Sequence, residues 1–240
     1  MGYNNAMKLA ARVSDKYFLT ENERFLLVKL ELVEPDRIEF RAGQYVSLKV
    51  NESGERRSYS IVTTPDNNHG LSLLAEMVKE GKGSEYLRGI ELGSEVEIVG
   101  PLGKFTVTEE DKRLFVASGS GIVPIMSMIN DLLLNQHEKK SIRLHWGMRS
   151  EADLFWVDNL ERLSEAHPNF VFDIVLSKPS EAWELCSGHV QDCLKRDFSQ
   201  EGLGGWSGYV CGSPKMVEST TQELEKLGIP ADKIYHEKFV

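Results

Sequence analysis

Residues 114–124 read Leu-Phe-Val-Ala-Ser-Gly-Ser-Gly-Ile-Val-Pro, and this stretch decides how the C-terminal half of the chain folds. Residues 114–117 are apolar and have the composition of a buried strand. The glycines at positions 119 and 121 let the main chain turn tightly. A helix is expected next, because apolar residues recur every three to four positions from Ile122 to Leu133.

A strand that enters a helix through glycines can hold a phosphate group. The glycines allow close approach of the ligand, and the first turn of the helix offers unpaired N–H groups and the positive end of its dipole. Pro124 stands where such a turn often has a third glycine, and in the first helical turn its missing N–H costs little. An ordinary strand-to-helix turn is the alternative interpretation of this stretch.

The sequence after this turn alternates between strand and helix patterns. Strands are expected at 142–146, 171–176 and 209–211, and helices at 151–166 and 216–227. Such alternation predicts a parallel sheet with helices on both faces. A second turn, Cys211-Gly212-Ser213-Pro214, ends the last of these strands, so it should meet the first turn at the carboxyl edge of the sheet.

The first half of the chain has a different rhythm. Short apolar segments at 25–28, 45–50, 71–74 and 96–99 are separated by glycine, proline and asparagine. Many short strands with turn signals predict a barrel or a sandwich, with one short helical turn at 84–88. The boundary is expected within 108–112, which divides the chain into domains 1–108 and 109–240.

Composition excludes several classes of function. The 240 residues carry 28 Lys and Arg against 37 Asp and Glu, a net charge of -9, so an overall basic footprint for nucleic acid or anionic membrane is missing. The apolar stretch 114–129 is too interrupted to span a membrane. The six histidines show no ligand spacing, so no metal site is expected.

The three cysteines are Cys186, Cys193 and Cys211, too few for the four thiolates of a plant-type iron–sulfur cluster. Their number is odd, and no leader pattern opens the sequence. We therefore expect reduced thiols and a cytoplasmic protein.

Six signatures follow one another along the chain: R-x-Y-S at 57–60, G-x-x-S at 81–84, G-P-x-G-x-F at 100–105, G-x-G-x-x-P at 119–124, C-G-x-P at 211–214 and E-x-F at 237–239. Each alone has a plain alternative, such as a surface charge, a core aromatic or an ordinary turn. In this order they resemble the ferredoxin–NADP(+) reductase-like flavoprotein family over residues 8–240. The resemblance implies an N-terminal antiparallel Greek-key β-barrel that binds flavin and a C-terminal Rossmann-like α/β domain with a parallel sheet.

The resemblance also implies roles for the flavin-binding residues. Arg57 would pair with the flavin phosphates, since a guanidinium binds phosphate with two hydrogen bonds. Ser58 would belong to the same binding segment, Tyr59 would lie against the isoalloxazine ring, and Ser60 would stand near flavin N5. Gly83-Ser84 would hold the diphosphate at the start of a helical turn, which favours FAD over FMN.

Two glycine turns and two cations are the expected binding residues of the nicotinamide nucleotide. These residues are Gly119, Ser120, Gly121, Pro124, Gly212, Arg149 and Lys178. An arginine after the second strand suits a 2′-phosphate better than a free ribose hydroxyl, so NADP is expected rather than NAD. An exposed surface charge is the alternative for Arg149.

Two residues, Cys211 and Glu237, are assigned to the chemistry together with Ser60, and Phe239 is assigned to flavin binding. Cys211 would place the nicotinamide, Glu237 would relay a proton, and Phe239 would stack on the flavin. A small buried residue is an equal interpretation of Cys211. Fraying of the chain end is the alternative for Glu237 and Phe239.

The function implied is hydride transfer from NAD(P)H to bound FAD, followed by electron transfer to a protein such as ferredoxin or flavodoxin. A basic rim could steer such an acidic carrier, formed by Arg56, Arg57, Lys79, Lys82 and Lys104. Such a rim predicts a turnover rate that falls as salt is added. Lysines scattered over the surface predict no such dependence on salt. The alternatives are an NAD(P)H:flavin reductase, the reductase component of an oxygenase, and a non-catalytic nucleotide-binding regulatory subunit.

Overall fold

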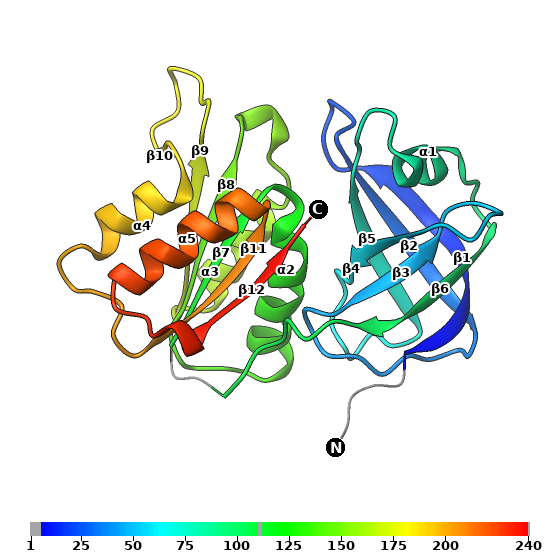
Figure 1. The fold of residues 1–240 in the computed structure, drawn as a ribbon, viewed down its shortest axis with the longest axis horizontal. Helices are drawn as coiled ribbons and strands as arrows, with labels where there is room; N and C mark the ends of the chain where they lie inside the picture. Colours follow the sequence, from blue (N-terminus) through cyan, green and yellow to red (C-terminus); the bar gives the residue numbers. More distant parts are fainter. Residues whose placement is uncertain (1–5, 110–111, 240) are drawn as a thin grey trace. The chain divides into compact units, whose positions relative to one another are not determined.

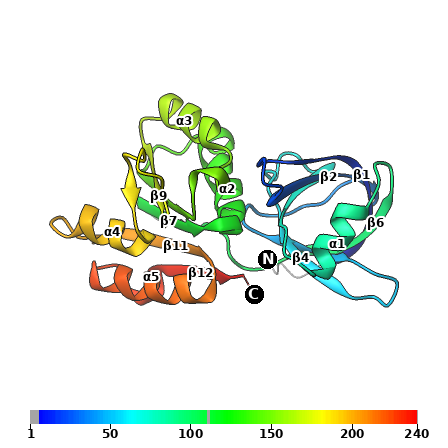
Figure 2. The ribbon, with the colours of Figure 1, turned by 90° about the horizontal axis from the view of Figure 1, so that it is seen from above.

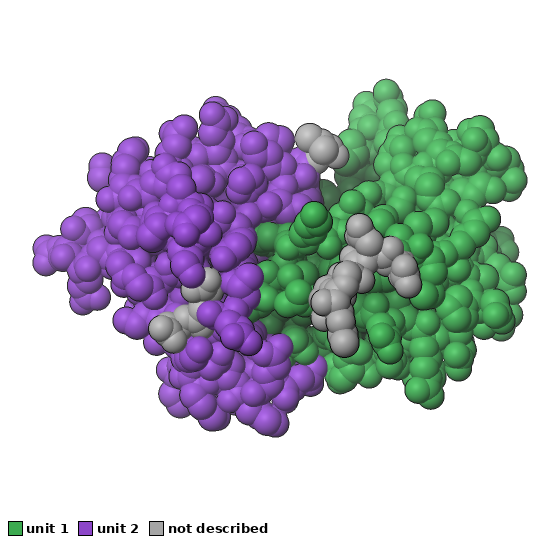
Figure 3. All heavy atoms as spheres, turned by 60° about the horizontal axis from the view of Figure 1, so that its bottom comes forward, with its two compact units in different colours: residues 1–107, 126–131 green, residues 108–125, 132–240 purple. Residues whose placement is uncertain are grey.

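The computed structural model describes residues 6–109 and 112–239, so residues 110 and 111 of the expected boundary and the first five residues of the chain lie outside the described part. Two compact units are present (Figure 3). Unit 1 comprises residues 1–107 together with 126–131, and unit 2 comprises 108–125 together with 132–240.

Unit 1 is built on one antiparallel sheet of six strands in the order β4-β3-β6-β1-β2-β5 (Figure 1). The strands are β1 (Met7–Phe18), β2 (Phe25–Glu34), β3 (Tyr45–Lys49), β4 (Arg56–Ser60), β5 (Gly70–Glu76) and β6 (Glu95–Leu102). The two edges of the sheet almost close, because Ile61 after β4 bridges Leu73 of β5 and Val62 N donates to Ser72 O. The predicted antiparallel β-barrel is confirmed.

The pattern of burial in β1 explains how this sheet makes a core. Leu9, Ala11 and Val13 are almost fully buried, and the residues between them are more exposed. Alternation of this kind places one face of the strand inside the barrel and the other in solvent. Helix α1 (Lys82–Gly89) buries Leu87 against the same core and covers the helical turn expected at 84–88.

Unit 2 is built on a parallel sheet in the order β10-β9-β8-β7-β11-β12. The strands are β7 (Lys112–Ser118), β8 (Ile142–Met148), β9 (Phe170–Leu176), β10 (Cys186–Ser187), β11 (Trp206–Gly212) and β12 (Ile234–Lys238). The strand order reverses between β7 and β11, and the crevice beyond such a reversal is where open α/β sheets bind ligands. The predicted parallel-sheet domain is confirmed.

Helices cover both faces of this sheet. The helices that follow β7, β8, β10 and β11 are α2 (Ile122–Asn130), α3 (Val157–Ala166), α4 (Val190–Phe198) and α5 (Pro214–Lys226). Figure 2 shows α4 and α5 on one face and α3 on the other. Leu194 and Leu224 pack from α4 and α5 against Leu114 and Val210 of the sheet. Among the described residues, no helix has the length and apolar content that a bilayer crossing requires.

Two of the three cysteines are joined in a disulfide, Cys186 to Cys193. The expectation of three reduced thiols is therefore wrong for this pair. Their spacing of seven residues matches no motif, but β10 and α4 bring their Cα atoms to 6.7 Å, within the usual range for a disulfide. Cys211 is free and buried.

Candidate functional site

The turn after β7 has the shape that the sequence predicts. Gly119 adopts a left-handed conformation (φ +54°), residues Gly119–Gly121 form a short 3₁₀ turn, and α2 begins directly at Ile122. Pro124 is the third residue of α2, where no intrahelical partner is lost. The turn thus places the start of α2 at the carboxyl edge of the sheet, with the Ile122 N–H bonded to Gly119 O.

The turn after β11 lies directly against the turn after β7. A side chain at Gly121 would collide with the Cys211 carbonyl, with its Cβ 2.6 Å from the Cys211 carbonyl carbon and 2.8 Å from Gly212 N. A Cβ on Gly212 would collide with Ser118 Oγ. The structure therefore brings Gly119, Ser120, Gly121, Cys211 and Gly212 together where the strand order reverses.

The helix after the second turn is capped by its own sequence. Ser213 is the N-cap of α5, and its Oγ accepts a hydrogen bond from Met216 N at 3.4 Å. Pro214 occupies the first helical position, which fixes the start of the helix. The C-G-x-P signature is thus a strand end followed by a capped helix start.

Arg149 and Lys178 lie next to each other at the ends of β8 and β9. Lys178 N donates to Arg149 O at 2.8 Å, and both side chains are exposed. Sequence analysis did not single out Glu151, which lies two residues beyond Arg149 and accepts hydrogen bonds from Ser180 N and Oγ at 2.8 and 2.7 Å. These hydrogen bonds hold the pKa of the Glu151 carboxyl below its usual range. The cationic pair therefore has an ionised acid close by in the chain.

Cys211 and Glu237 are paired in register on the neighbouring strands β11 and β12. Burial raises the pKa of the Cys211 thiol well above its usual value, and the nearby Glu237 carboxylate raises it further, so the thiol stays neutral. Burial raises the pKa of Glu237 to about 7. The main chain of Phe239 is held in place, because Phe239 N donates to Gly212 O at 2.9 Å. In the described chain, Glu237 and Phe239 thus belong to an ordered strand and its end, not to a frayed terminus.

In unit 1, two signatures distant in sequence meet at the start of α1. A Cβ on Gly83 would collide with Tyr59 Oη and stand 3.1 Å from Arg57 Cγ. Gly81, the N-cap of α1, has no side-chain hydrogen bond that caps the helix. The first turn of α1 therefore lies against Arg57 and Tyr59 with its helix start uncapped by a side chain. We call this arrangement the α1 cradle, defined by Arg57, Tyr59 and the first turn at Gly83.

The remaining residues of these signatures are placed as follows. Burial raises the pKa of Tyr59 to about 12, so its phenol stays neutral. Ser84 Oγ accepts from Val78 N at 2.8 Å and so ties the preceding loop to the helix. Alternation along β4 puts Ser58 and Ser60 on the face opposite Arg57 and Tyr59, with Ser58 exposed and Ser60 buried.

Glu55 belongs to this cradle and was missed by sequence analysis. Its two carboxylate oxygens accept from Arg57 Nη2 and Lys82 Nζ, each at 2.7 Å. The hydrogen bonds from Lys82 and Arg57 lower the pKa of Glu55 to about 2. A carboxylate thus already pairs with the two cations that a phosphate would use. Glu55 stands alone before the R-x-Y-S signature and belongs to no motif. Its pairing with Lys82 exists only once the β3–β4 hairpin and α1 are folded.

The expected basic rim is partly neutralised by acids in the fold. Arg56 pairs with Glu97 at 2.8 Å, and Arg57 and Lys82 pair with Glu55. Lys79 lines a hollow of about 560 Å³ at the start of α1, where three cations are matched by three acids, Glu23, Glu80 and Glu85. The other two cations of this hollow are Arg24 and Arg88, so its lining carries no excess of positive charge.

These two sites fit two dinucleotides. In unit 1, the α1 cradle offers an arginine, a helix start and a glycine with no room for a side chain, as a flavin dinucleotide needs. In unit 2, the glycine turns at the strand reversal offer the same fit to a nicotinamide dinucleotide.

Comparison with known proteins agrees with this assignment. Residues 10–107 match the oxidoreductase FAD-binding domain, and residues 115–222 match the oxidoreductase NAD-binding domain. The crystal structure of the Amycolatopsis cytochrome P450 reductase GcoB superposes with a TM-score of 0.89 and 30% identity, over 97% of this chain and 70% of that one. The chain belongs to the ferredoxin–NADP(+) reductase-like flavoprotein family. The resemblance seen in the sequence is thereby confirmed, as are FAD and a nicotinamide nucleotide as its cofactors.

Relatives of this family member include oxygenase reductases. The aromatic O-demethylase reductase subunit of Amycolatopsis sp. is 33% identical over 88% of this chain and 64% of its own length. The propane 2-monooxygenase reductase component of Rhodococcus jostii is 31% identical over 88% of this chain and 59% of its own length. The chain thus spans about three fifths of the length of these curated relatives. A ferredoxin NADP+ reductase from Neisseria gonorrhoeae shares the fold, with a TM-score of 0.82 at 20% identity over 98% of this chain and 99% of that one.

Proposed function

We propose that this chain takes hydride from NADPH onto bound FAD and passes the electrons to a protein acceptor. The observation that carries the proposal is that helix starts bordered by crowded glycines lie in both halves of one chain, each within a domain that matches a nucleotide-binding family. When bound, FAD supplies the chemistry, because it accepts two electrons as hydride and can release them one at a time.

The residues of the α1 cradle bind FAD in this proposal. Arg57 pairs with the diphosphate through its guanidinium, and the first turn of α1 at Gly83-Ser84 supplies N–H groups to the same phosphates. Tyr59 lies against the isoalloxazine ring as a neutral phenol, and Ser58 and Ser60 complete the segment, with Ser60 near N5. The role of Ser60 is tested by Ser60→Ala, which should slow flavin reduction and leave FAD affinity unchanged.

The residues of unit 2 bind and orient the nicotinamide nucleotide. The turn Gly119-Ser120-Gly121 and Gly212 hold the phosphates, with Pro124 fixing the start of α2. Cys211 positions the nicotinamide with a small neutral side chain. Glu237, whose pKa of about 7 lets it gain and lose a proton near neutrality, holds a proton at its carboxyl group. Phe239 is the aromatic ring that the nicotinamide displaces.

NADPH is proposed over NADH because of the adjacent cations at the ends of β8 and β9. Arg149 and Lys178 suit a 2′-phosphate, whereas Glu151 nearby would accept a hydrogen bond from a free 2′-hydroxyl. The double variant R149A/K178A should lower kcat/KM for NADPH about tenfold and leave that for NADH within twofold. Equal loss with both nucleotides would contradict this choice.

The acceptor is proposed to be an electron carrier of the ferredoxin or flavodoxin class that serves an oxygenase. The names of the relatives support this choice, since they are reductase components of monooxygenase and demethylase systems. Because its cosubstrate is a nicotinamide nucleotide, the proposed compartment is the cytoplasm.

The test is anaerobic mixing of the FAD-loaded protein with NADPH and with NADH. We expect loss of the flavin absorbance near ~450 nm, typical of oxidised flavin, and its return on addition of an oxidised [2Fe–2S] ferredoxin. Failure of both nucleotides to bleach the flavin would overturn the proposal. Reoxidation only by added free FMN would instead identify a flavin reductase, and a protein that takes up no FAD would identify a regulatory subunit.

A further inference from the structure

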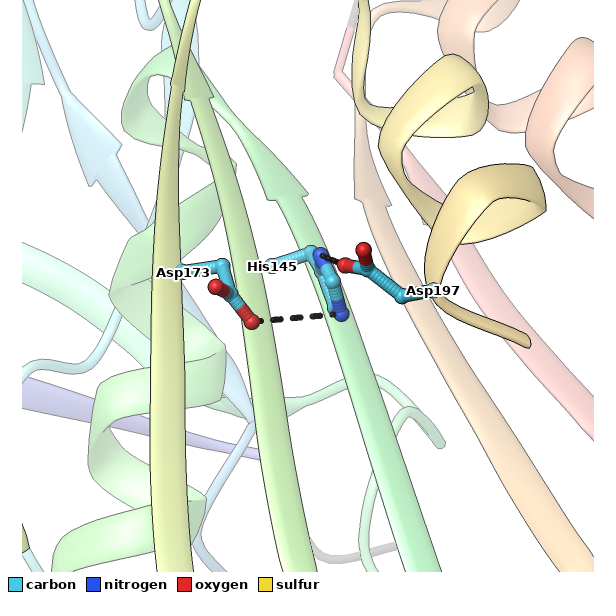
Figure 4. A group of neighbouring side chains, drawn as sticks. All are labelled: His145, Asp173 and Asp197. Atoms are coloured by element: carbon cyan, nitrogen blue, oxygen red, sulfur yellow. Dashed lines mark ion pairs between the residues drawn. The ribbon is translucent and has the colours of Figure 1, made fainter. Parts of the chain in front are cut away.

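His145 lies in the middle of β8 and is completely buried. Figure 4 shows its ring between Asp173 of β9 and Asp197 of α4. Among the described residues, neither ring nitrogen of His145 has a hydrogen-bond partner. Buried polar groups in folded proteins nearly always have one, so this imidazole requires an explanation.

The distances around the ring exclude direct hydrogen bonds. Nε2 of His145 is 3.6 Å from Asp173 Oδ2, and Nδ1 is 4.0 Å from Asp197 Oδ2. Charge-assisted hydrogen bonds would bring these atoms to about 2.7–2.9 Å. An imidazole gives only one of its nitrogens to an ion. Ligand atoms around a tetrahedral zinc ion are about 3.3 Å apart, because each lies about 2.0–2.2 Å from the metal. The 3.6 Å between Nε2 and Asp173 Oδ2 is close to that spacing. The three side chains can offer one ligand atom each, all within 4.8 Å of one another.

The chemistry of the three side chains also suits a cation. The two carboxylates bring two negative charges to the ring. Arg196 Nε binds the other oxygen of Asp197, Oδ1, at 2.8 Å, which leaves Oδ2 directed at His145.

We propose that His145, Asp173 and Asp197 form a binding site for one divalent transition-metal ion of the zinc class. One imidazole nitrogen and two carboxylates are ligands that Zn²⁺ accepts, and a fourth position can be taken by water. The Asp173 side chain is 37% exposed and the Asp197 side chain 18%, so an ion can enter from the solvent.

The site has a structural consequence for α4. Asp197 stands near the end of this helix, and Cys193 within it is joined to β10 through the disulfide with Cys186. A metal ion would connect the end of α4 to β8 and β9. Neither connection uses a residue of the glycine turns that bind the nucleotide in the proposed function.

The experiment is calorimetric titration of the FAD-loaded full chain with Zn²⁺ after treatment with a chelator and desalting. We expect one tight site, weakened at least 100-fold in His145→Gln. The matched control is His167→Gln, which removes a histidine at the C-terminal end of α3 and should bind Zn²⁺ like the parent protein. Equal affinity in the parent and His145→Gln, or no binding by the parent, would overturn the proposal.

A second measurement keeps the test valid if His145→Gln fails to fold. Asp173→Asn changes a partly exposed ligand and should weaken Zn²⁺ at least tenfold while the flavin spectrum stays native. Zn²⁺ should also raise the thermal unfolding midpoint of the parent and of His167→Gln more than that of Asp173→Asn. The same rise in all three proteins would contradict a site at these residues.

Discussion

In the proposed function, the two nucleotide cradles of this protein would hold an anion by different physical means. In unit 1, the α1 cradle uses the side-chain cations Arg57 and Lys82, which Glu55 already pairs with. In unit 2, the two turns meet through close contact, where Gly121 lies against the Cys211 carbonyl and Gly212 against Ser118 Oγ, with no room for a Cβ on either glycine.

This difference determines which amino-acid substitutions each cradle tolerates. A charge-based site can be strengthened or weakened in steps, because every neighbouring charge adds to or subtracts from it. A site formed by close main-chain contact fails with a single added methyl group, since backbone atoms on both sides cannot move aside cheaply. The predictions below test this contrast.

The largest effect is expected for Gly121→Ala. Its methyl group would overlap the Cys211 carbonyl, so the turn must shift and NADPH affinity should fall at least 100-fold. Gly204→Ala is the matched control, because no atom lies within 4 Å of the position of its Cβ. Titration of each variant with NADPH, followed by quenching of flavin fluorescence, measures the effect. Similar affinities in the two variants would show that close contact does not define this cradle.

A smaller loss is expected for Arg57→Ala. Removal of the guanidinium takes away a two-point contact with the diphosphate, so FAD affinity should fall about 10–100-fold. Arg57→Lys should recover only part of it, because an ammonium is a point charge. The control is Arg12→Ala, an exposed arginine of β1 paired with Glu95. Reconstitution of apo-protein with FAD gives the dissociation constants, and unchanged affinity in Arg57→Ala would place the diphosphate elsewhere.

Glu237→Gln should change the pH dependence of unit 2. The pKa of about 7 lies above the usual 4.5, so the stabilising proton is present below pH 4.5 and is lost as pH rises through 7. Gln mimics the protonated acid, so at pH 8 the variant should gain about 1–3 kcal/mol relative to the parent.

Urea unfolding at pH 5 and pH 8 measures the stability difference of Glu237→Gln, and stopped-flow flavin reduction measures its catalytic counterpart. The rate in the parent should depend on a group with a pKa near 7, and that dependence should vanish in the variant. Glu225→Gln, exposed on α5, is the control. If Glu237→Gln and Glu225→Gln changed the flavin reduction rate and the stability by the same amount relative to the parent, Glu237 would not hold the proton.

The smallest effect is expected for Glu55→Gln. Glu55 competes with a phosphate for Arg57 and Lys82, so its neutralisation should tighten FAD binding about two- to fivefold at low salt and less at high salt. Glu95→Gln, which removes an exposed acid elsewhere on the barrel, should leave FAD affinity unchanged. Weaker FAD binding in Glu55→Gln would mean that Glu55 orients Arg57 instead of competing for it.

Local patterns were enough to predict most elements of the fold. Apolar runs such as 114–117 and 25–28 predicted strands, because a continuous run of apolar residues is typical of a strand segment that is buried on both faces. The helix at 216–227 was predicted from its period and its end at Gly228, and the structure has α5 at Pro214–Lys226. By contrast, β1 and α4 were not predicted, although both carry a periodic pattern: Leu9, Ala11 and Val13 alternate in β1, and the buried residues of α4 recur every three to four positions.

The residues of the proposed sites divide in the same way. Arg57, Gly83, Gly121 and Cys211 lie in short signatures, so the sequence was sufficient to point to them. Glu55 and Glu151 lie in no signature, and their importance depends on which cations and hydroxyls the fold brings within reach. The disulfide between Cys186 and Cys193 was also missed for this reason.

The sequence by itself determined the two-domain architecture and the two glycine turns of unit 2, because strand periodicity and glycine positions are local properties of the chain. Only the tertiary structure decided which titratable groups meet: Glu55 with Lys82, Cys211 beside Glu237, and His145 between two aspartates. These pairs join strands and helices that are separated in sequence, and the energy of a charge depends on its burial and on its neighbours in space.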